Sequence, residues 1–188
     1  MEELKDLYIA IDEAFARIRE EFSDEVRCGQ GCEDCCRAVF DVSLVEAVGV
    51  LAMFQGLDEE TRSQITGNAS VAIQIWDELI DDSGSDLAQA RMRCPLLDDA
   101  GKCLCYEVRP VNCRSYGVPT VINGAGHVCG FSGFEKGVDY PTINLEQVQN
   151  ALLEMSIKLV GEDDGRLRWP IAAVLLDPGK IIALLKSS

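Results

Sequence analysis

The chain reads CGQGCEDCC from Cys28 to Cys36. Within this stretch, Cys32 and Cys35 have the C-x2-C spacing with which one tight turn presents two thiolates to one metal ion. The adjacent pair Cys35 and Cys36 is unusual, because neighbouring side chains diverge and rarely bind one ion together. The pair therefore fits two metal ions or two corners of a cluster. Two glycines in the first half of the stretch indicate a loop there.

A second cysteine-rich segment follows about 60 residues later, and it contains Cys94, Cys103, Cys105, Cys113 and Cys129. The composition of residues 98–101, Asp-Asp-Ala-Gly, predicts a hairpin tip that would bring Cys94 and Cys103 together. Residues 28–36 and 94–133 hold all nine cysteines and eight of the 16 glycines. Such segments bury little apolar surface, so we expect a metal to hold them together.

The length, composition and charge of the chain limit which folds and which binding partners are expected. The chain has 188 residues, 47% of them hydrophobic, which predicts a single domain over 1–188 and excludes wholesale disorder. Its 32 acidic residues outnumber 17 basic ones, giving a net charge of −15. So negative a chain without a basic stripe argues against nucleic-acid binding. No apolar run approaches the roughly 20 residues that span a bilayer, so we expect no membrane insertion.

The expected cellular compartment decides whether the cysteines more often bind metal or form disulfides. The first residues lack a basic segment followed by an apolar one, so we predict no export signal and a cytoplasmic protein. In a reducing cytoplasm, clustered cysteines indicate metal ligation or thiol chemistry more often than structural disulfides. Nine is also an odd number, which leaves at least one thiol unpaired.

Hydrophobic periodicity predicts helices on both sides of the cysteine segments. An amphipathic pattern predicts an N-terminal helix over 4–22, and a capping box at Ser43-x-x-Glu46 predicts a second helix to about residue 54. Asp58 can cap a third helix to about residue 80, and Asn144 begins C-terminal helices over 144–186 that break at 177–179. The predicted fold is mainly α: a small helical domain with an irregular, metal-tied, Cys-rich centre and little or no β-structure.

The joint pattern resembles a known family, the YkgJ-type CxxCxxCC cysteine-cluster proteins, which are described as zinc- or iron-chelating. The family motif begins with a cysteine cluster, here Cys28 to Cys36, and continues with C-P-x-L, here residues 94–97. A block of the form G-x-C-x-x-Y-x-x-R-P-x-x-C-R follows, here residues 101–114. Cys129 matches a further downstream cysteine of the family. The resemblance spans about residues 28–130.

Two departures from the family pattern concern single cysteines. Three residues separate Cys28 from Cys32 where the family has two, and Cys105 stands where the family has an aliphatic residue. The resemblance therefore implies a packing or accessory role for Cys105. The metal ligands that remain are Cys28, Cys32, Cys35, Cys36, Cys94, Cys103, Cys113 and Cys129.

Eight thiolates would make two four-thiolate sites or one multinuclear site with bridging sulfurs. Eight thiolates carry −8 and two divalent ions return +4, so the region needs hydrogen-bond donors and cations around it. We assign that role, as donors to sulfur or partners of nearby carboxylates, to Arg37, Arg93, Arg109 and Arg114. The resemblance adds Tyr106 as a residue that closes the site. His127, the single histidine, is expected to be solvated, with a role as an alternative ligand if a cysteine is displaced.

The predicted function is metal binding, with zinc or iron as the cofactor and more than one ion per chain. An iron–sulfur cluster in a redox protein is the alternative, since thiolates are also the usual ligands of such clusters. Thiol exchange or chelation at Cys32, Cys35 and Cys36 is a third hypothesis. A resemblance of the cysteine cluster to that of flagellin lysine methylases implies a fourth, a component of protein-modifying machinery with a protein partner. Whether the chain is an enzyme stays open.

Overall fold

The computed structural model describes residues 1–29, 31–84, 86–87 and 89–187. Helices hold 53% and strands 10% of these residues, so the predicted fold class, mainly α with little β-structure, is confirmed. No helix among the described residues is long and apolar enough to cross a membrane.

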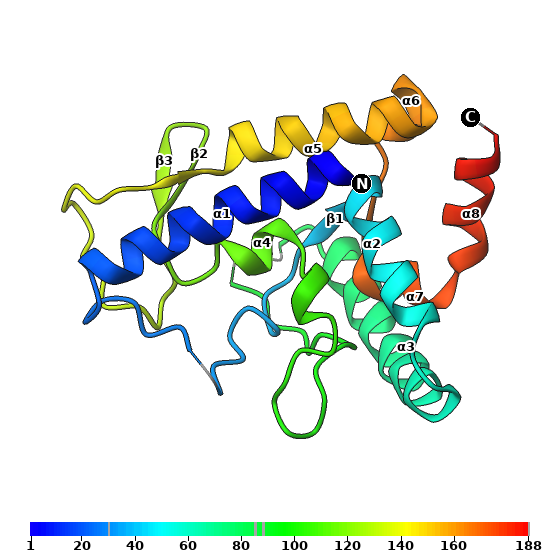
Figure 1. Cartoon of the computed structure of the whole chain (residues 1–188). Coiled ribbons are helices and arrows are strands. Elements are labelled where there is room, and N and C mark those ends of the chain that lie inside the picture. Colours follow the sequence, from blue (N-terminus) through cyan, green and yellow to red (C-terminus); the bar gives the residue numbers. More distant parts are fainter. Residues whose placement is uncertain (30, 85, 88, 188) are drawn as a thin grey trace.

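Two long helices form one side of the molecule. Helix α1 (Glu2–Glu21) lies beside α5 (Leu145–Val160), and the two run in opposite directions (Figure 1). Near their ends, Lys158 Nζ pairs with Glu3 Oε2 at 2.9 Å. Asn144 accepts from the N–H of Gln147 at 3.1 Å, so the predicted cap of α5 is confirmed. The apolar cluster between these helices includes Leu4, Tyr8, Ile11, Ile18, Val45, Val111, Leu145 and Leu152.

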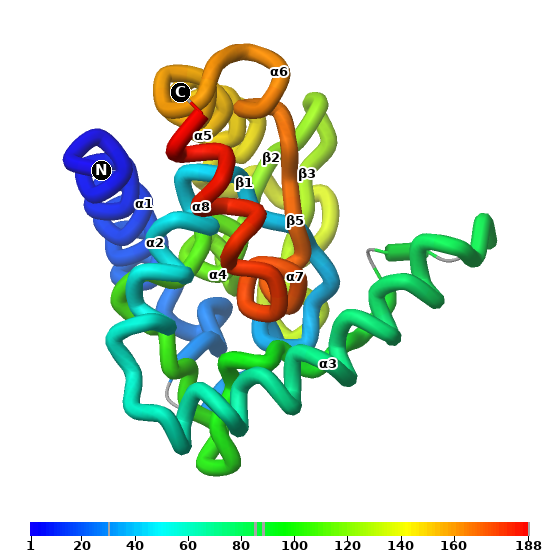
Figure 2. Tube along the Cα trace, turned by 90° about the vertical axis from the view of Figure 1, so that its right-hand side faces the viewer, coloured from blue at the N-terminus to red at the C-terminus, as the bar shows by residue number. Residues whose placement is uncertain are grey.

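A second group of helices packs around α2 (Leu44–Gln55), which is largely apolar. Helix α2 contacts α7 (Ile171–Leu176) and α8 (Pro178–Lys186), and α7 in turn packs on α3 (Glu59–Asp81), whose far end projects from the molecule in Figure 2. Asp58 caps α3 by accepting from the N–H of Thr61 at 2.8 Å, as predicted. Asp177 accepts from the N–H of Lys180 at 3.3 Å, so the predicted break falls between α7 and α8.

The strands are short and tie distant segments together. Strand β1 (Asp41–Ser43) pairs antiparallel with β5 (Arg168–Pro170), which follows the four-residue helix α6 (Glu162–Gly165). A second sheet has the order β3-β2-β4, with β2 (Thr120–Ile122) antiparallel to β3 (Ala125–His127) and parallel to β4 (Ile143–Asn144). The first sheet joins an early segment of the chain to a late one, and the second lies within residues 120–144.

Most of the two cysteine segments lies below α1 in Figure 1, while the β2–β3 hairpin of the second segment extends up to the level of α5. The regular pieces of the two segments also include a 3-10 turn (Tyr106–Val108) and the one-turn helix α4 (Val111–Arg114). The N–H of Cys94 donates to the carbonyl of Cys36 at 2.7 Å, and that of Met92 donates to the carbonyl of Arg37 at 2.9 Å. The two segments, about 60 residues apart in the sequence, are therefore joined directly through their backbones.

Candidate metal centre

Six cysteines surround a cavity of about 30 Å³, which we call the inner cavity. They come from both cysteine segments: Cys35, Cys36, Cys94, Cys103, Cys105 and Cys113. A cavity needs about 10–15 Å³ of space for a water-sized sphere to hold one water molecule. By the same measure, the inner cavity has room for one or two ions. Thiolates are the preferred ligands of zinc and of iron in clusters, so both the size and the donor set fit such metals.

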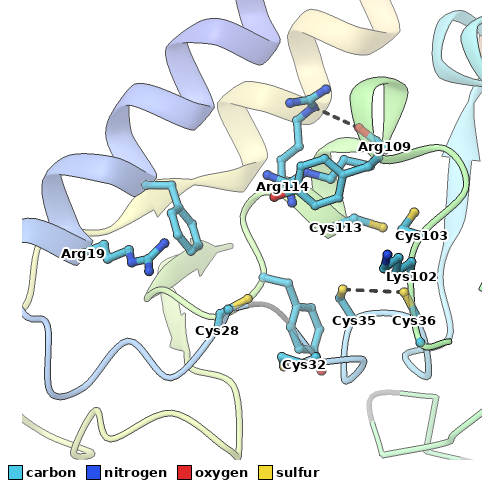
Figure 3. A pocket seen from close by; sticks show the side chains of 16 residues that line it. Arg19, Cys28, Cys32, Cys35, Cys36, Lys102, Cys103, Arg109, Cys113 and Arg114 are labelled. Carbon is cyan, nitrogen blue, oxygen red and sulfur yellow. Dashed lines mark hydrogen bonds between the residues drawn. The ribbon is translucent and has the colours of Figure 1, made fainter.

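Two pairs of sulfurs are already at the spacing that one ion requires. Cys35 Sγ lies 4.0 Å from Cys36 Sγ (Figure 3), and Cys103 Sγ lies 3.5 Å from Cys105 Sγ. A zinc–sulfur bond of about 2.3 Å places two ligands of a tetrahedral ion about 3.8 Å apart. The expectation that the sulfurs of Cys35 and Cys36 diverge was therefore wrong, because the turn at residues 33–36 places both on the same side.

A larger cavity of about 510 Å³, which we call the outer cavity, adjoins the inner one. The two share Cys35, Cys36, Cys103 and Cys113. Cys28 and Cys32 line the outer cavity alone, and Cys32 is exposed at its edge. Seven of the eight cysteines that the sequence nominates as ligands thus line one pair of adjoining cavities.

Cys129 is the nominated ligand that the structure does not bring to the others. Its thiol donates to Asp34 Oδ2 at 3.3 Å, and its sulfur accepts from the N–H of Phe131 at 3.4 Å. It lines a separate cavity of about 320 Å³ together with His127, which is exposed at the end of β3. Cys105, for which the family pattern implies packing, takes the eighth position around the two cavities.

Glycine is required beside Cys28, one of the cysteines that line the outer cavity. Gly117 has a φ of +102°, a conformation that side chains with a Cβ rarely adopt. A Cβ added there would lie 2.6 Å from the Cβ of Cys28, far inside van der Waals contact. The absence of a side chain at this residue therefore lets Cys28 reach the wall of the cavity.

A buried carboxylate holds the helix that carries Cys113. Glu46 in α2 is 2% exposed, and its Oε2 accepts from the N–H and the Oγ of Ser43 at 2.9 and 2.7 Å, which confirms the capping box. Its Oε1 accepts from the N–H of Val111, the first residue of α4, at 2.8 Å. The sequence indicates the first role through Ser43-x-x-Glu46, but no local signal indicates the second.

The arginines around the cysteines have carboxylate partners, as one of the two predicted roles requires. Arg114 is 6% exposed in its side chain, where it pairs with Asp12 of α1, donates to the carbonyls of Glu107 and Arg109, and stacks on the Tyr8 ring at 4.0 Å. Arg109 reaches the same carboxylate at 3.5 Å. Arg37 pairs with Glu33 at 3.0 Å, and Arg93 pairs with Asp99 at 3.7 Å and with Glu33 at 4.0 Å.

The protonation of the thiols depends on their depth and on their contacts. Burial raises the pKa of Cys28 to about 11 and that of Cys94 to about 12, and it also raises the pKa of Cys113. Hydrogen bonds donated by Cys105 and Cys36 lower the pKa of Cys103, and a hydrogen bond from Cys36 lowers that of Cys35. Without a metal, most of these thiols are therefore protonated near neutral pH.

Among the described residues, no three Cys, His, Asp or Glu side chains stand in a finished metal-binding arrangement. The structure gathers the sulfurs of the two segments without arranging them around a single point.

Comparison with known proteins identifies the family. The CxxCxxCC family, described as a putative zinc- or iron-chelating domain, matches residues 27–130, which is more than half of the chain. The chain belongs to this family. The matched region contains all nine cysteines, including the six that line the inner cavity. No curated protein and no solved structure matches the chain.

Proposed function

We propose that this CxxCxxCC protein binds zinc or iron in the inner cavity through thiolates of both cysteine segments. Five predicted ligands face this cavity: Cys35, Cys36, Cys94, Cys103 and Cys113. Cys28 and Cys32 extend the set along the outer cavity, which supports a centre with more than one ion. The observation that carries the proposal is the convergence of sulfurs from two remote segments on one cavity of the size of an ion.

A bound metal would supply a cross-link between the two segments. Deprotonated thiols repel one another, and a divalent ion removes that repulsion while it fixes the positions of the sulfurs. All-thiolate tetrahedral zinc is normally structural, because four sulfurs leave no open position. Arg109 and Arg114 pair with Asp12 in α1 and so hold the 106–114 segment, which carries Cys113, in place. We leave Cys129 out of the ligand set because its thiol is hydrogen-bonded to Asp34.

An iron–sulfur cluster is the second candidate for the same residues. Six sulfurs line the inner cavity, more than one tetrahedral ion uses, and clusters take their ligands from such sets. In that case the protein would transfer electrons, alone or within protein-modifying machinery. All nine cysteines are free thiols, which suits a reducing compartment such as the cytoplasm.

Elemental analysis of the anaerobically purified chain tests the proposal and separates the two candidates. We expect one or more tightly held ions per chain: a colourless protein with zinc supports the first candidate, and a brown protein with iron and sulfide supports the second. Replacing Cys113 by Ser should release metal and lower the melting temperature, whereas Cys129→Ser, the matched control, should do neither. Full metal content and an unchanged melting curve in Cys113→Ser would overturn the proposal.

A further inference from the structure

The outer cavity is far larger than a metal centre needs. Its volume is about 510 Å³, against about 30 Å³ for the inner cavity that it adjoins. Cavities that bind small molecules typically measure about 300–1,000 Å³. The outer cavity therefore has room for a small organic molecule above the sulfurs.

The walls of the outer cavity carry positive charge, whereas the chain as a whole is negative. Four cationic side chains line the cavity, Arg19, Lys102, Arg109 and Arg114, and no Asp or Glu is among its described lining residues. This exclusion of carboxylates occurs in a chain with 32 acidic and 17 basic residues. Aromatic rings supply apolar surface on the same walls, from Phe15, Tyr106 and Tyr116. Cations with aromatic surface are the combination that favours an organic anion.

Two of the four cations are already engaged. Arg109 and Arg114 share Asp12, and the Arg109 guanidinium lies 4.2 Å from the centre of the Tyr106 ring. The Nε of Arg109 is nevertheless buried without a hydrogen-bond partner. Burying a donor without a partner costs free energy, but a buried nitrogen does not face the open cavity, so it offers no donor to a ligand there.

The other two cations are free. Arg19 and Lys102 are exposed, and in the described part of the chain no carboxylate oxygen lies within 4.0 Å of either side chain's nitrogens. Figure 3 shows them on opposite sides of the cavity, with sulfurs between them. Other surface cations in the described part of the chain also have no carboxylate within 4.0 Å, but Arg19 and Lys102 both face the outer cavity, which the cysteines line.

We propose that the outer cavity binds a small organic anion, a carboxylate or phosphate ester with an apolar body, whose charge is met by Arg19 and Lys102. The body would lie against Phe15 and Tyr106, next to the shared sulfurs. The inference rests on the proposed function only for the metal beneath the ligand, because the cavity and its cations are present without it.

An aromatic dye pair tests the proposal on the full-length protein as purified anaerobically. The anionic probe is 8-anilinonaphthalene-1-sulfonate, and its uncharged counterpart is N-phenyl-1-naphthylamine. Fluorescence titration should show one site per chain for the anion. We expect Arg19→Gln and Lys102→Gln to weaken anion binding about threefold each and about tenfold together, which is the size of one or two exposed charge contacts. Binding of the neutral dye should not change in these variants.

A double variant with the same change of charge is the control. Lys5 and Arg17 lie on α1, are exposed and do not line the outer cavity. If Lys5→Gln/Arg17→Gln weakens anion binding as much as Arg19→Gln/Lys102→Gln, the overall charge is responsible and the proposed site is wrong. An equal loss of affinity for both dyes in Arg19→Gln/Lys102→Gln would also overturn the site, because the two cations would then not be selecting a charge.

Metal content measured on the same samples keeps the two proposals apart. Metal without selective anion binding would overturn the anion site alone. Selective anion binding by a chain that holds no metal would overturn the proposed function alone.

Discussion

Replacing Glu46 by Ala should destabilise the protein far more than the loss of an ordinary helix cap. The side chain accepts two buried backbone N–H groups, those of Ser43 and Val111, and both residues are at most 3% exposed. A buried donor left without a partner costs about 1–3 kcal/mol, so the two together cost about 4 kcal/mol. Because Val111 begins α4, the substitution should also weaken zinc binding through Cys113.

Urea unfolding followed by circular dichroism, in the presence of a chelator, measures the first effect. Asp58→Ala is the matched control, since Asp58 caps α3 at the surface and its loss should cost about 1 kcal/mol. Zinc competition with a chromophoric chelator measures the second effect, which the control should not show. A loss of stability in Glu46→Ala no larger than that in Asp58→Ala would refute the reasoning.

Three further predictions concern the cysteines. Gly117→Ala should lower the number of bound ions by displacing Cys28, without loss of helical circular dichroism, as elemental analysis and far-ultraviolet spectra will show. Zinc affinity should fall as pH falls, because Cys28 and Cys94, whose pKa values are raised to about 11 and about 12, are protonated without metal and must each release a proton on binding. Calorimetry in buffers of different ionisation enthalpy should count at least two protons. Cys105→Ser should weaken zinc binding more than Cys129→Ser, since Cys105 faces the inner cavity, and equal affinities would contradict that placement.

The long helices could be predicted because their signals are local. Asp58 and Asn144 each cap a helix with their own side chain, and the Asp177-Pro178-Gly179 break separates α7 from α8. Each of these features depends on residues within one or two turns, so the printed sequence contains the whole physical cause.

Strand pairing was harder because its causes are spread over the chain. The pairing of β1 with β5 joins segments about 127 residues apart, and three-residue strands carry almost no alternation to recognise. The turn at Asn123-Gly124 is different, because its signal is local. Both residues have positive φ, at 51° and 73°, and close the β2–β3 hairpin. Asn-Gly between short strands is a recognised hairpin sequence.

The cysteine spacing nominated candidates but did not decide which sulfurs meet. Cys105 lies beside Cys103 and lines the inner cavity, whereas Cys129 lies near Asp34. Backbone pairing between the 36–38 and 91–94 segments brings Cys35 and Cys36 to the same cavity. Such an outcome depends on tertiary hydrogen bonds that no motif contains. The second role of Glu46 was out of reach for the same reason, since its partner Val111 is 65 residues away.

Most of the buried apolar side chains that stabilise the fold come from the helices, whereas the thiols of the candidate metal centre come from other segments. The two apolar clusters consist mainly of side chains from α1, α2, α3, α5, α7 and α8, whereas the thiols stand on loops and on the single turn of α4. Contacts that connect the two include the hydrogen bond from Val111 of α4 to Glu46 and the ion pair between Arg114 and Asp12. Buried residues of the second cysteine segment, such as Leu96 and Cys105, also belong to an apolar cluster. These contacts, with the backbone hydrogen bond from Cys94 to Cys36, hold the two cysteine segments against each other. The fold thus gathers the sulfurs along one pair of cavities, where under the proposed function a bound metal would fix their final arrangement.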